Sequence, residues 1–160
     1  NLIAELKKGG KLIFIRHAYA PGIGDPDNFD IDNCNTQRNL NDVGREQAKK
    51  IGAFFKKNNI TVDEIYSSEW CRCKETAQIA FNKYEKKNFL NSFFSSRFFK
   101  NKDSQMIKLK RFIYNHDNKK NIIFLTHYVV INETLNYSSN SGEIIVIDKN
   151  YNILGNFMTN

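Results

Sequence analysis

The stretch KLIFI at residues 11–15 decides how this chain is expected to fold. It is a short apolar run with β-branched side chains, which is typical of a strand buried inside a sheet. The run leads directly into Arg16 and His17, so two polar groups stand where the strand ends. A second apolar run, NIIFLT at residues 121–126, leads directly into His127. The sequence therefore predicts two buried strands, each of which ends in a histidine.

Helical patterns alternate with strand patterns along the rest of the chain. Asn41 or Asp42 is expected to cap a helix that runs to about residue 57, and Ser67-Ser68 to cap a helix that ends near Phe81. Further helices are expected near residues 106–113 and 129–136, and further strands at 64–66, 144–147 and 153–157, while the aromatic segment 88–99 is ambiguous. This alternation predicts the α/β class, as a single-domain three-layer α/β/α sandwich over residues 1–160 with a mostly parallel sheet and a C-terminal hairpin.

Length, composition and charge narrow the classes of function. With 160 residues, of which 41% are hydrophobic and 13% aromatic, the chain suits one globular domain and not a disordered one. No apolar run approaches the roughly 20 residues that a membrane-spanning helix needs. The net charge of +7 favours anionic partners such as phosphates. The lysines lie in scattered pairs and not in one patch, so no nucleic-acid partner is expected.

The cysteines and the first residue bear on the compartment. The chain begins with Asn1 and not with methionine, so its natural N-terminus is expected to be missing or processed. Cys34, Cys71 and Cys73 lack the spacing of a metal site, and no metal is expected. A disulfide from Cys34 to Cys71 or Cys73 and buried free thiols are both compatible with the sequence, ahead of a catalytic cysteine. The cysteines and the long polar loop after His17 favour an exported, periplasmic protein over a cytoplasmic one.

Several of the predicted strands lead into histidine or arginine residues, whose side chains can bind a phosphate or act as nucleophiles. In an open α/β sheet, ligands bind beyond the carboxyl ends of the strands, where the following loops converge. One histidine after a strand is more often structural, but two of them with arginines available indicate a shared site. The expected participants come from three strand ends: Arg16, His17, Arg72 and His127.

Four segments are similar, in order and spacing, to one enzyme family. They are IRHA at residues 15–18, LNDVGREQA at 40–48, YSSEWCRCKETA at 66–77 and TH at 126–127. Together they resemble the histidine phosphatase superfamily in its phosphoglycerate-mutase-like branch, and the small phosphatases of that branch in particular. The resemblance spans essentially the whole chain. It implies a phosphomonoester hydrolase that works through a phosphohistidine intermediate without a cofactor.

The resemblance also implies a role for each residue at the strand ends. His17 would be the nucleophile, and His127 would donate a hydrogen bond to the transferring group. Arg16 and Arg72 would clamp the phosphate. Elementary chemistry agrees with these roles, because an imidazole with a pKa near 6.5 is largely neutral and nucleophilic at neutral pH. The planar fork of an arginine binds two phosphate oxygens at once.

The chain departs from the family pattern in three places. Ala18 stands where the family usually has glycine, and residues 89–94 (FLNSFF) carry no glutamate where many members have a general acid. The acid is then Asp25 or another loop aspartate such as Asp30, or it is missing, as in members that act on phosphohistidine. The large insertions of mutases are also missing, so hydrolysis is favoured over mutase-type transfer.

Other polar residues have less specific expectations. Gln37 and Arg38, at the end of the long loop, are expected to contact the substrate at the rim of the site, with plain surface positions as the alternative. Asn91 is a further candidate for substrate binding. His116 is expected on the surface.

Other functions remain compatible with the sequence. A non-catalytic module could use the same pocket to bind an anionic ligand, and a phosphoglycerate-mutase-type phosphotransferase is a second alternative. For the hydrolase, the expected partner is a phosphorylated small molecule or a phosphohistidine protein. The sequence does not indicate an oligomeric state.

Overall fold

The run that leads to His17 forms β1 (Leu12–Arg16), a central strand of a six-stranded sheet. β1 pairs in parallel with β4 (Ile122–Thr126), and β4 pairs in parallel with β2 (Glu64–Ser67). The short β3 (Glu85–Lys86) pairs in parallel with β2 at the edge, and the sheet order is β3-β2-β4-β1-β5-β6. The carboxyl ends of β1, β2 and β4 therefore lie together at one end of the sheet.

A C-terminal hairpin of β5 (Ile144–Ile147) and β6 (Ile153–Phe157) completes the sheet. β5 pairs antiparallel with β1, and β6 pairs antiparallel with β5. In the turn between them, the N–H of Tyr151 donates to the carbonyl oxygen of Asp148. The predicted mostly parallel sheet with a C-terminal hairpin is confirmed.

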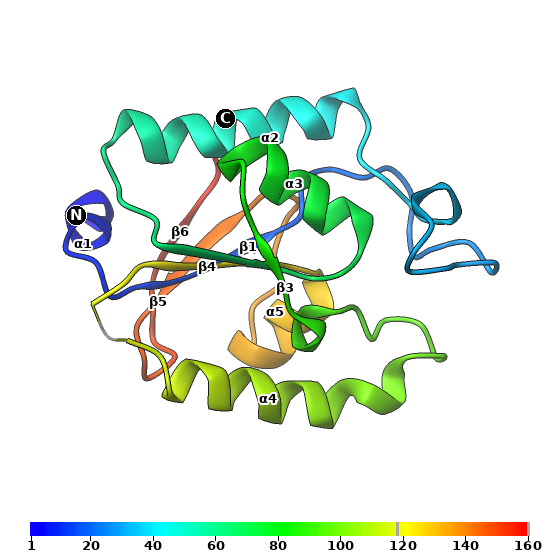
Figure 1. The fold of residues 1–160 in the computed structure, drawn as a ribbon. Helices are drawn as coiled ribbons and strands as arrows, with labels where there is room; N and C mark the ends of the chain where they lie inside the picture. Colours follow the sequence, from blue (N-terminus) through cyan, green and yellow to red (C-terminus); the bar gives the residue numbers. More distant parts are fainter. Residues whose placement is uncertain (118, 160) are drawn as a thin grey trace.

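The computed structural model describes residues 1–117 and 119–159, and in it helices cover both faces of the sheet (Figure 1). On one face lie α1 (Leu2–Lys7), α2 (Asp42–Lys57) and α3 (Cys71–Phe81). On the other face lie α4 (Lys102–Tyr114) and α5 (Tyr128–Leu135). The predicted three-layer α/β/α arrangement is therefore confirmed. Within the described part of the chain, none of these helices is both long and apolar enough to span a bilayer.

Side chains alternate along β1 and divide the core between the two helical layers. Ile13 and Ile15 pack toward α2 and α3, whereas Leu12 and Phe14 pack toward α4 and α5. All four residues are at most 2% exposed. A strand that is buried on both faces needs apolar residues at successive positions, which explains why it reads as a continuous apolar run in the sequence.

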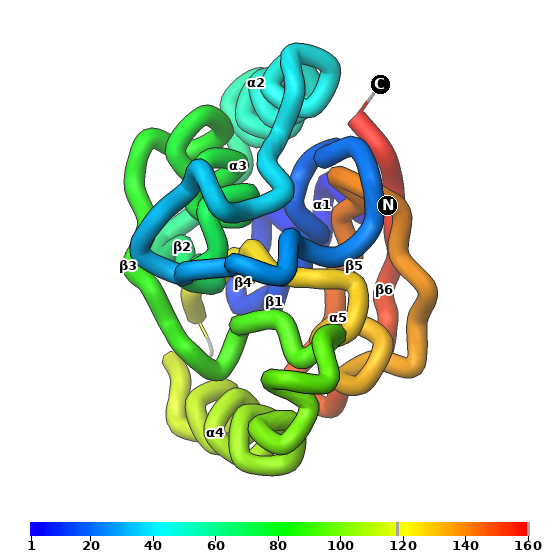
Figure 2. Tube along the Cα trace, turned by 90° about the vertical axis from the view of Figure 1, so that its right-hand side faces the viewer, coloured from blue at the N-terminus to red at the C-terminus, as the bar shows by residue number. Residues whose placement is uncertain are grey.

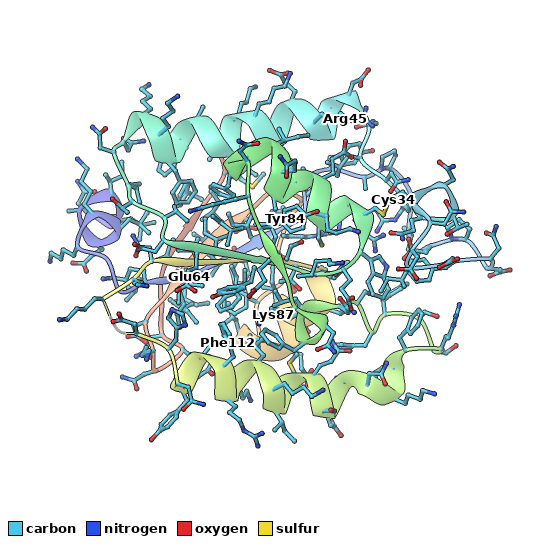
Figure 3. The ribbon with its side chains drawn as sticks, viewed as in Figure 1. Cys34, Arg45, Glu64, Tyr84, Lys87 and Phe112 are labelled. Carbon is cyan, nitrogen blue, oxygen red and sulfur yellow. A yellow bond between two sulfur atoms is a disulfide. The ribbon has the colours of Figure 1, made fainter. Side chains whose placement is uncertain are left out.

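An aromatic cluster holds α4 against the sheet near β2. The ring of Phe112 packs edge-on against Tyr66 with the ring centroids 4.9 Å apart. Lys87 lies beside Phe112 (Figure 3), with its Nζ 5.4 Å from the ring centroid. His116 also belongs to this cluster, since its ring centroid lies 5.6 Å from that of Phe112, and its Nε2 lies 2.9 Å from Glu64 Oε2. The side chain of His116 is 13% exposed, so this histidine, expected on the surface, is partly buried.

Some local features differ from the sequence predictions. The patterns do not predict α1 or β3, because six and two residues are too few to show a period. α3 begins at Cys71 with Trp70 as its N-cap residue, so the cap expected at Ser67-Ser68 is wrong. The ambiguous segment contains two short 3₁₀ helices, Asn88–Leu90 and Phe99–Asn101.

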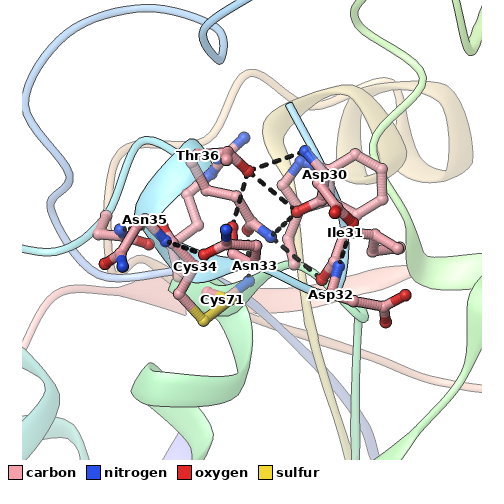
Figure 4. Close-up of a disulfide and its surroundings, with 12 residues drawn as sticks. Asp30, Ile31, Asp32, Asn33, Cys34, Asn35, Thr36 and Cys71 are labelled. Atoms are coloured by element: carbon pink, nitrogen blue, oxygen red, sulfur yellow. Dashed lines mark hydrogen bonds between the residues drawn. A yellow bond between two sulfur atoms is a disulfide. The ribbon is translucent and has the colours of Figure 1, made fainter. Parts of the chain in front are cut away.

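The long loop between β1 and α2 is tied to α3 by a disulfide. Cys34 of this loop bonds to Cys71, the first residue of α3 (Figure 4). Cys73 is a buried free thiol. Beside the bond, the loop forms a tight turn in which Thr36 Oγ1 accepts a hydrogen bond from the N–H of Asp30. The disulfide therefore fastens the loop directly beside the predicted site.

Candidate active site

The loops at the carboxyl ends of the strands enclose a pocket of about 410 Å³. Figure 2 views the molecule from this end and shows the chain between β1 and α2 passing in front of the strand ends. The rings of His17 and His127 lie with their centroids 5.6 Å apart. The pocket wall includes all four residues expected to meet there: Arg16, His17, Arg72 and His127.

Two contacts fix which nitrogen of His17 carries a proton. Nδ1 lies 2.8 Å from the carbonyl oxygen of Ala18, which can only accept, so Nδ1 must donate. Arg72 Nε lies 3.2 Å from His17 Nε2 and can only donate, so Nε2 must offer its lone pair. Both contacts require the same neutral tautomer. The lone pair at Nε2 is then the nucleophilic group of this ring.

His17 stays neutral at pH 7 because its pKa lies well below the ordinary value of 6.5. Burial lowers this pKa most, since His17 is 2% exposed, and the positive charge of Arg72 lowers it further. The pKa of His127 also lies well below 6.5, through burial first and the charge of Arg72 second. The pocket therefore holds two neutral imidazoles at neutral pH.

Arg72 links His17 to the loop after β1. Its Nε donates to His17 Nε2, and its Nη1 donates to Asp25 Oδ1 at 2.8 Å. The first turn of α3 carries Arg72, and Thr76 one turn later donates its hydroxyl to the Arg72 carbonyl while accepting from the N–H of Ala18. These bonds fix α3 against the end of β1, and Arg72 is only 3% exposed.

Arginines outnumber acidic residues in the pocket wall. Burial, followed by repulsion from Arg72, lowers the pKa of Arg38 to about 10, and the same two causes lower the pKa of Arg16. A bound anion would relieve this repulsion, so the wall suits a phosphate. The charged residues of the described wall are four arginines and two aspartates: Arg16, Arg38, Arg72, Arg97, Asp25 and Asp27.

His127 enters the pocket from the end of β4. Its Nε2 lies 2.8 Å from Ser68 Oγ, and its Nδ1 is buried without a hydrogen-bond partner among the described residues. Since an unpartnered buried polar atom is unfavourable, a ligand that pairs with Nδ1 would stabilise the site. Cys73 Sγ lies 3.5 Å from Nε2, but burial raises the pKa of this thiol to about 12 and Cys73 is not part of the pocket wall. Cys73 is therefore not placed to act as a catalytic cysteine.

Asp25 lies in the pocket as a hydrogen-bond acceptor and not as a proton donor. Burial opposes its ionisation, yet the hydrogen bonds and charge of Arg72 prevail and hold the Asp25 pKa below its ordinary value. Its carboxylate also accepts from the N–H of Arg38 and from Trp70 Nε1. This environment favours the ionised carboxylate, which does not suit the role of general acid expected for Asp25. Asp30 is not an alternative, because it is exposed and lies outside the pocket wall.

Of the three predicted substrate contacts, only Arg38 lies in the pocket wall. Gln37 is 6% exposed, its Oε1 accepts from the N–H of Cys71, and its Nε2 donates to carbonyl oxygens of the loop. Asn91 Oδ1 accepts from the N–H of Glu69, which fixes the loop between β2 and α3. The expectation that Gln37 and Asn91 face the substrate is therefore corrected: both position the backbone beside Arg72.

The sequence patterns miss Trp70 as a pocket residue. They place it among the apolar residues of the helix, but its Nε1 donates to Asp25 Oδ2 at 3.0 Å and its ring stacks on Phe29 with centroids 4.8 Å apart. The only signal in the sequence is its place two residues before Arg72. Trp70 thereby holds the carboxylate that in turn holds Arg72.

The two low histidine pKa values predict a pH dependence of stability. Because the unfolded chain binds protons at these histidines near pH 6.5 while the folded protein does not, the free energy of unfolding is expected to fall as pH drops below about 6.5, until the folded pKa is reached. The slope approaches about 1.4 kcal/mol per pH unit for each histidine. Urea unfolding between pH 7.5 and 5 measures it. His17→Gln should lower the slope, and an unchanged slope would contradict the assigned shift.

Comparison with known sequences identifies a family over the part of the chain that holds His17 and Arg72. The model of the histidine phosphatase superfamily (branch 1) matches residues 12–90. Serine/threonine-protein phosphatase Pgam5, mitochondrial, of Drosophila grimshawi is 36% identical over 87 residues, which are 53% of this chain and 27% of that protein. The match thus spans little more than a quarter of the length of this relative.

Solved structures share the fold over nearly their whole length. The protein histidine phosphatase SixA complexed with tungstate superposes with a TM-score of 0.64 at 11% identity, covering 93% of this chain and 97% of that chain. Phosphoglycerate mutase from Thermus thermophilus gives a TM-score of 0.61 at 14% identity, covering 91% and 97%. At these identities the likeness concerns the fold alone. Residues 12–90, a little under half of the chain, thus match the histidine phosphatase superfamily, and the sheet topology agrees with that match.

Proposed function

We propose that this chain is a phosphomonoester hydrolase that carries the phosphoryl group on His17 during turnover. The observation that carries the proposal is the pair of contacts from Ala18 and Arg72, which hold the Nε2 lone pair of a neutral imidazole in the pocket. A buried neutral imidazole surrounded by guanidinium groups is suited to attack a phosphate dianion, because the cations offset the charge of the incoming group.

The chemistry takes two steps. In the first, the Nε2 lone pair of His17 forms a bond to phosphorus while the bond from phosphorus to the ester oxygen breaks. The leaving oxygen keeps the electron pair and takes a proton from water. In the second, a water molecule attacks the phosphohistidine and releases a proton to the solvent, the bond from phosphorus to Nε2 breaks with its electron pair returning to the nitrogen, and inorganic phosphate leaves. Arg16 and Arg72 bind the phosphoryl oxygens in both steps, and Nδ1 of His127 is free to pair with another.

The substrate is a phosphorylated small molecule or a phosphohistidine protein. Asp25 is ionised and Asp27 is exposed, so neither of the two carboxyl groups in the described pocket wall is placed as a buried proton donor. The pocket therefore suits a leaving group that needs little protonation. Hydrolysis is proposed over mutase-type transfer because the chain lacks insertions that would enclose a small acid away from water.

Trapping the intermediate tests this function. A brief incubation with an aryl phosphate carrying ³²P, stopped in alkali, is expected to leave label on the peptide that contains His17, and mild acid should release it. The His116→Ala variant is the control, since His116 lies outside the pocket wall, and it should label equally. If the wild type binds phosphate but takes no label, the pocket belongs to a non-catalytic anion-binding module instead.

A further inference from the structure

The pocket is larger than a phosphoryl group requires. Its volume of about 410 Å³ falls in the range of roughly 300–1,000 Å³ that is usual for sites which enclose a whole organic ligand. The phosphate-binding groups occupy one part of it, around His17 and Arg72. The rest of the wall must therefore contact the organic part of the substrate.

Apolar residues line much of that remaining wall, and most of them come from two loops. Ile23 belongs to the loop after β1, and Phe94 and Phe98 belong to the segment before α4. The two loops meet at Gly24, because a Cβ built there would lie 3.6 Å from Phe94 Cε2. Phe98 in turn packs edge-on against Trp70, with centroids 5.5 Å apart. An apolar surface therefore continues from the two loops to Trp70, whose Nε1 donates to Asp25.

Ile23 and Phe94 leave apolar surface uncovered beside the site. Ile23 is 89% exposed and Phe94 is 60% exposed, although both line the pocket. Exposed apolar side chains that gather at a concave site mark a surface which a ligand covers. Asp27 and Arg97, which also line the pocket, have opposite signs, so this pair favours neither an anionic nor a cationic organic group.

We infer that the organic part of the substrate is an apolar aromatic ring system, attached to the phosphate through a phenol-type oxygen, which packs on Ile23 and Phe94. This inference rests on the proposed function. Two independent features select this class: the apolar wall, and the lack of a buried protonated carboxyl among the described pocket residues, which suits an acidic phenol as the leaving group. A single imidazole ring, as in a phosphohistidine, would leave most of the wall uncovered.

A pair of aryl esters tests the inference. Phenyl phosphate and 2-naphthyl phosphate release phenols of similar acidity, so the ratio of their kcat/KM values reports on contacts to the second ring. The wild type is expected to favour 2-naphthyl phosphate by about tenfold, from the apolar area that the extra ring buries. Phe94→Ser and Ile23→Ser should each lower the ratio, and the double variant should bring it close to one.

Phe99→Ser is the matched control. Phe99 is 56% exposed and belongs to the same segment as Phe94, but it is not part of the pocket wall, so its variant should keep the wild-type ratio. Equal kcat/KM values for the two esters in the wild type, or an unchanged ratio in Phe94→Ser, would overturn the inference while the proposed function stands. Failure of the wild type to turn over either ester, with no label on His17, would overturn both.

Discussion

Replacing His17 with alanine is expected to lower kcat/KM for an aryl phosphate by at least about 10³-fold, because the variant loses the atom that accepts the phosphoryl group. Among the described pocket residues, no other group is placed to take over. His127 offers an unpartnered Nδ1, but its Nε2 is engaged with Ser68, and its ring lacks the arginine contact that His17 receives from Arg72. The measurement is steady-state release of the phenol, with the ³²P label followed in parallel.

The control separates loss of chemistry from loss of folding. His116→Ala removes an imidazole from the aromatic cluster beside β2, outside the pocket wall, and should keep its turnover number. His17→Ala should also still bind inorganic phosphate, since the arginines remain. A His17→Ala protein that is folded and turns over the ester at the wild-type rate would exclude His17 as the nucleophile.

The architecture could be predicted from the sequence because the central strands are buried on both faces. β1 and β4 are runs of consecutive apolar residues that lead into a histidine, and the carboxyl ends of parallel strands converge. This convergence needs no knowledge of side-chain packing. Short elements such as α1 and β3 could not be predicted, because they are too short to show a period in the sequence.

The details of the site could not be predicted, because they depend on the long loop. Gln37 reads as a polar loop residue in the sequence, and only the folded structure places its side chain against the N–H of Cys71. From the sequence, Asp25 is a candidate proton donor. In the structure Arg72 Nη1 lies 2.8 Å from Asp25 Oδ1, so the carboxylate accepts a hydrogen bond instead. The disulfide from Cys34 to Cys71 attaches this loop to α3 and so keeps it beside the pocket. Sequence patterns therefore predict which residues lie at the strand ends. They do not predict the contacts of the irregular loops between the strands and helices.

Arg72→Lys tests whether the guanidinium acts by geometry or by charge alone. Arg72 directs Nε to His17 and Nη1 to Asp25 at the same time, which requires a planar fork. A lysine keeps the positive charge, but its single ammonium group cannot make both contacts and also bind two phosphoryl oxygens. Removing such a donor set from the transition state is expected to lower kcat by about 10²- to 10³-fold.

The expected loss falls on kcat and less on KM, because the contact to the phosphoryl oxygens strengthens as charge develops in the transition state. Arg111→Lys is the matched control: Arg111 is an exposed arginine of α4 outside the pocket wall, and its variant should keep both constants. Measuring kcat and KM for phenyl phosphate in both variants decides between geometry and charge. If Arg72→Lys retained the wild-type kcat, a positive charge alone would suffice at this position, and the paired contacts to His17 and Asp25 would have no part in catalysis.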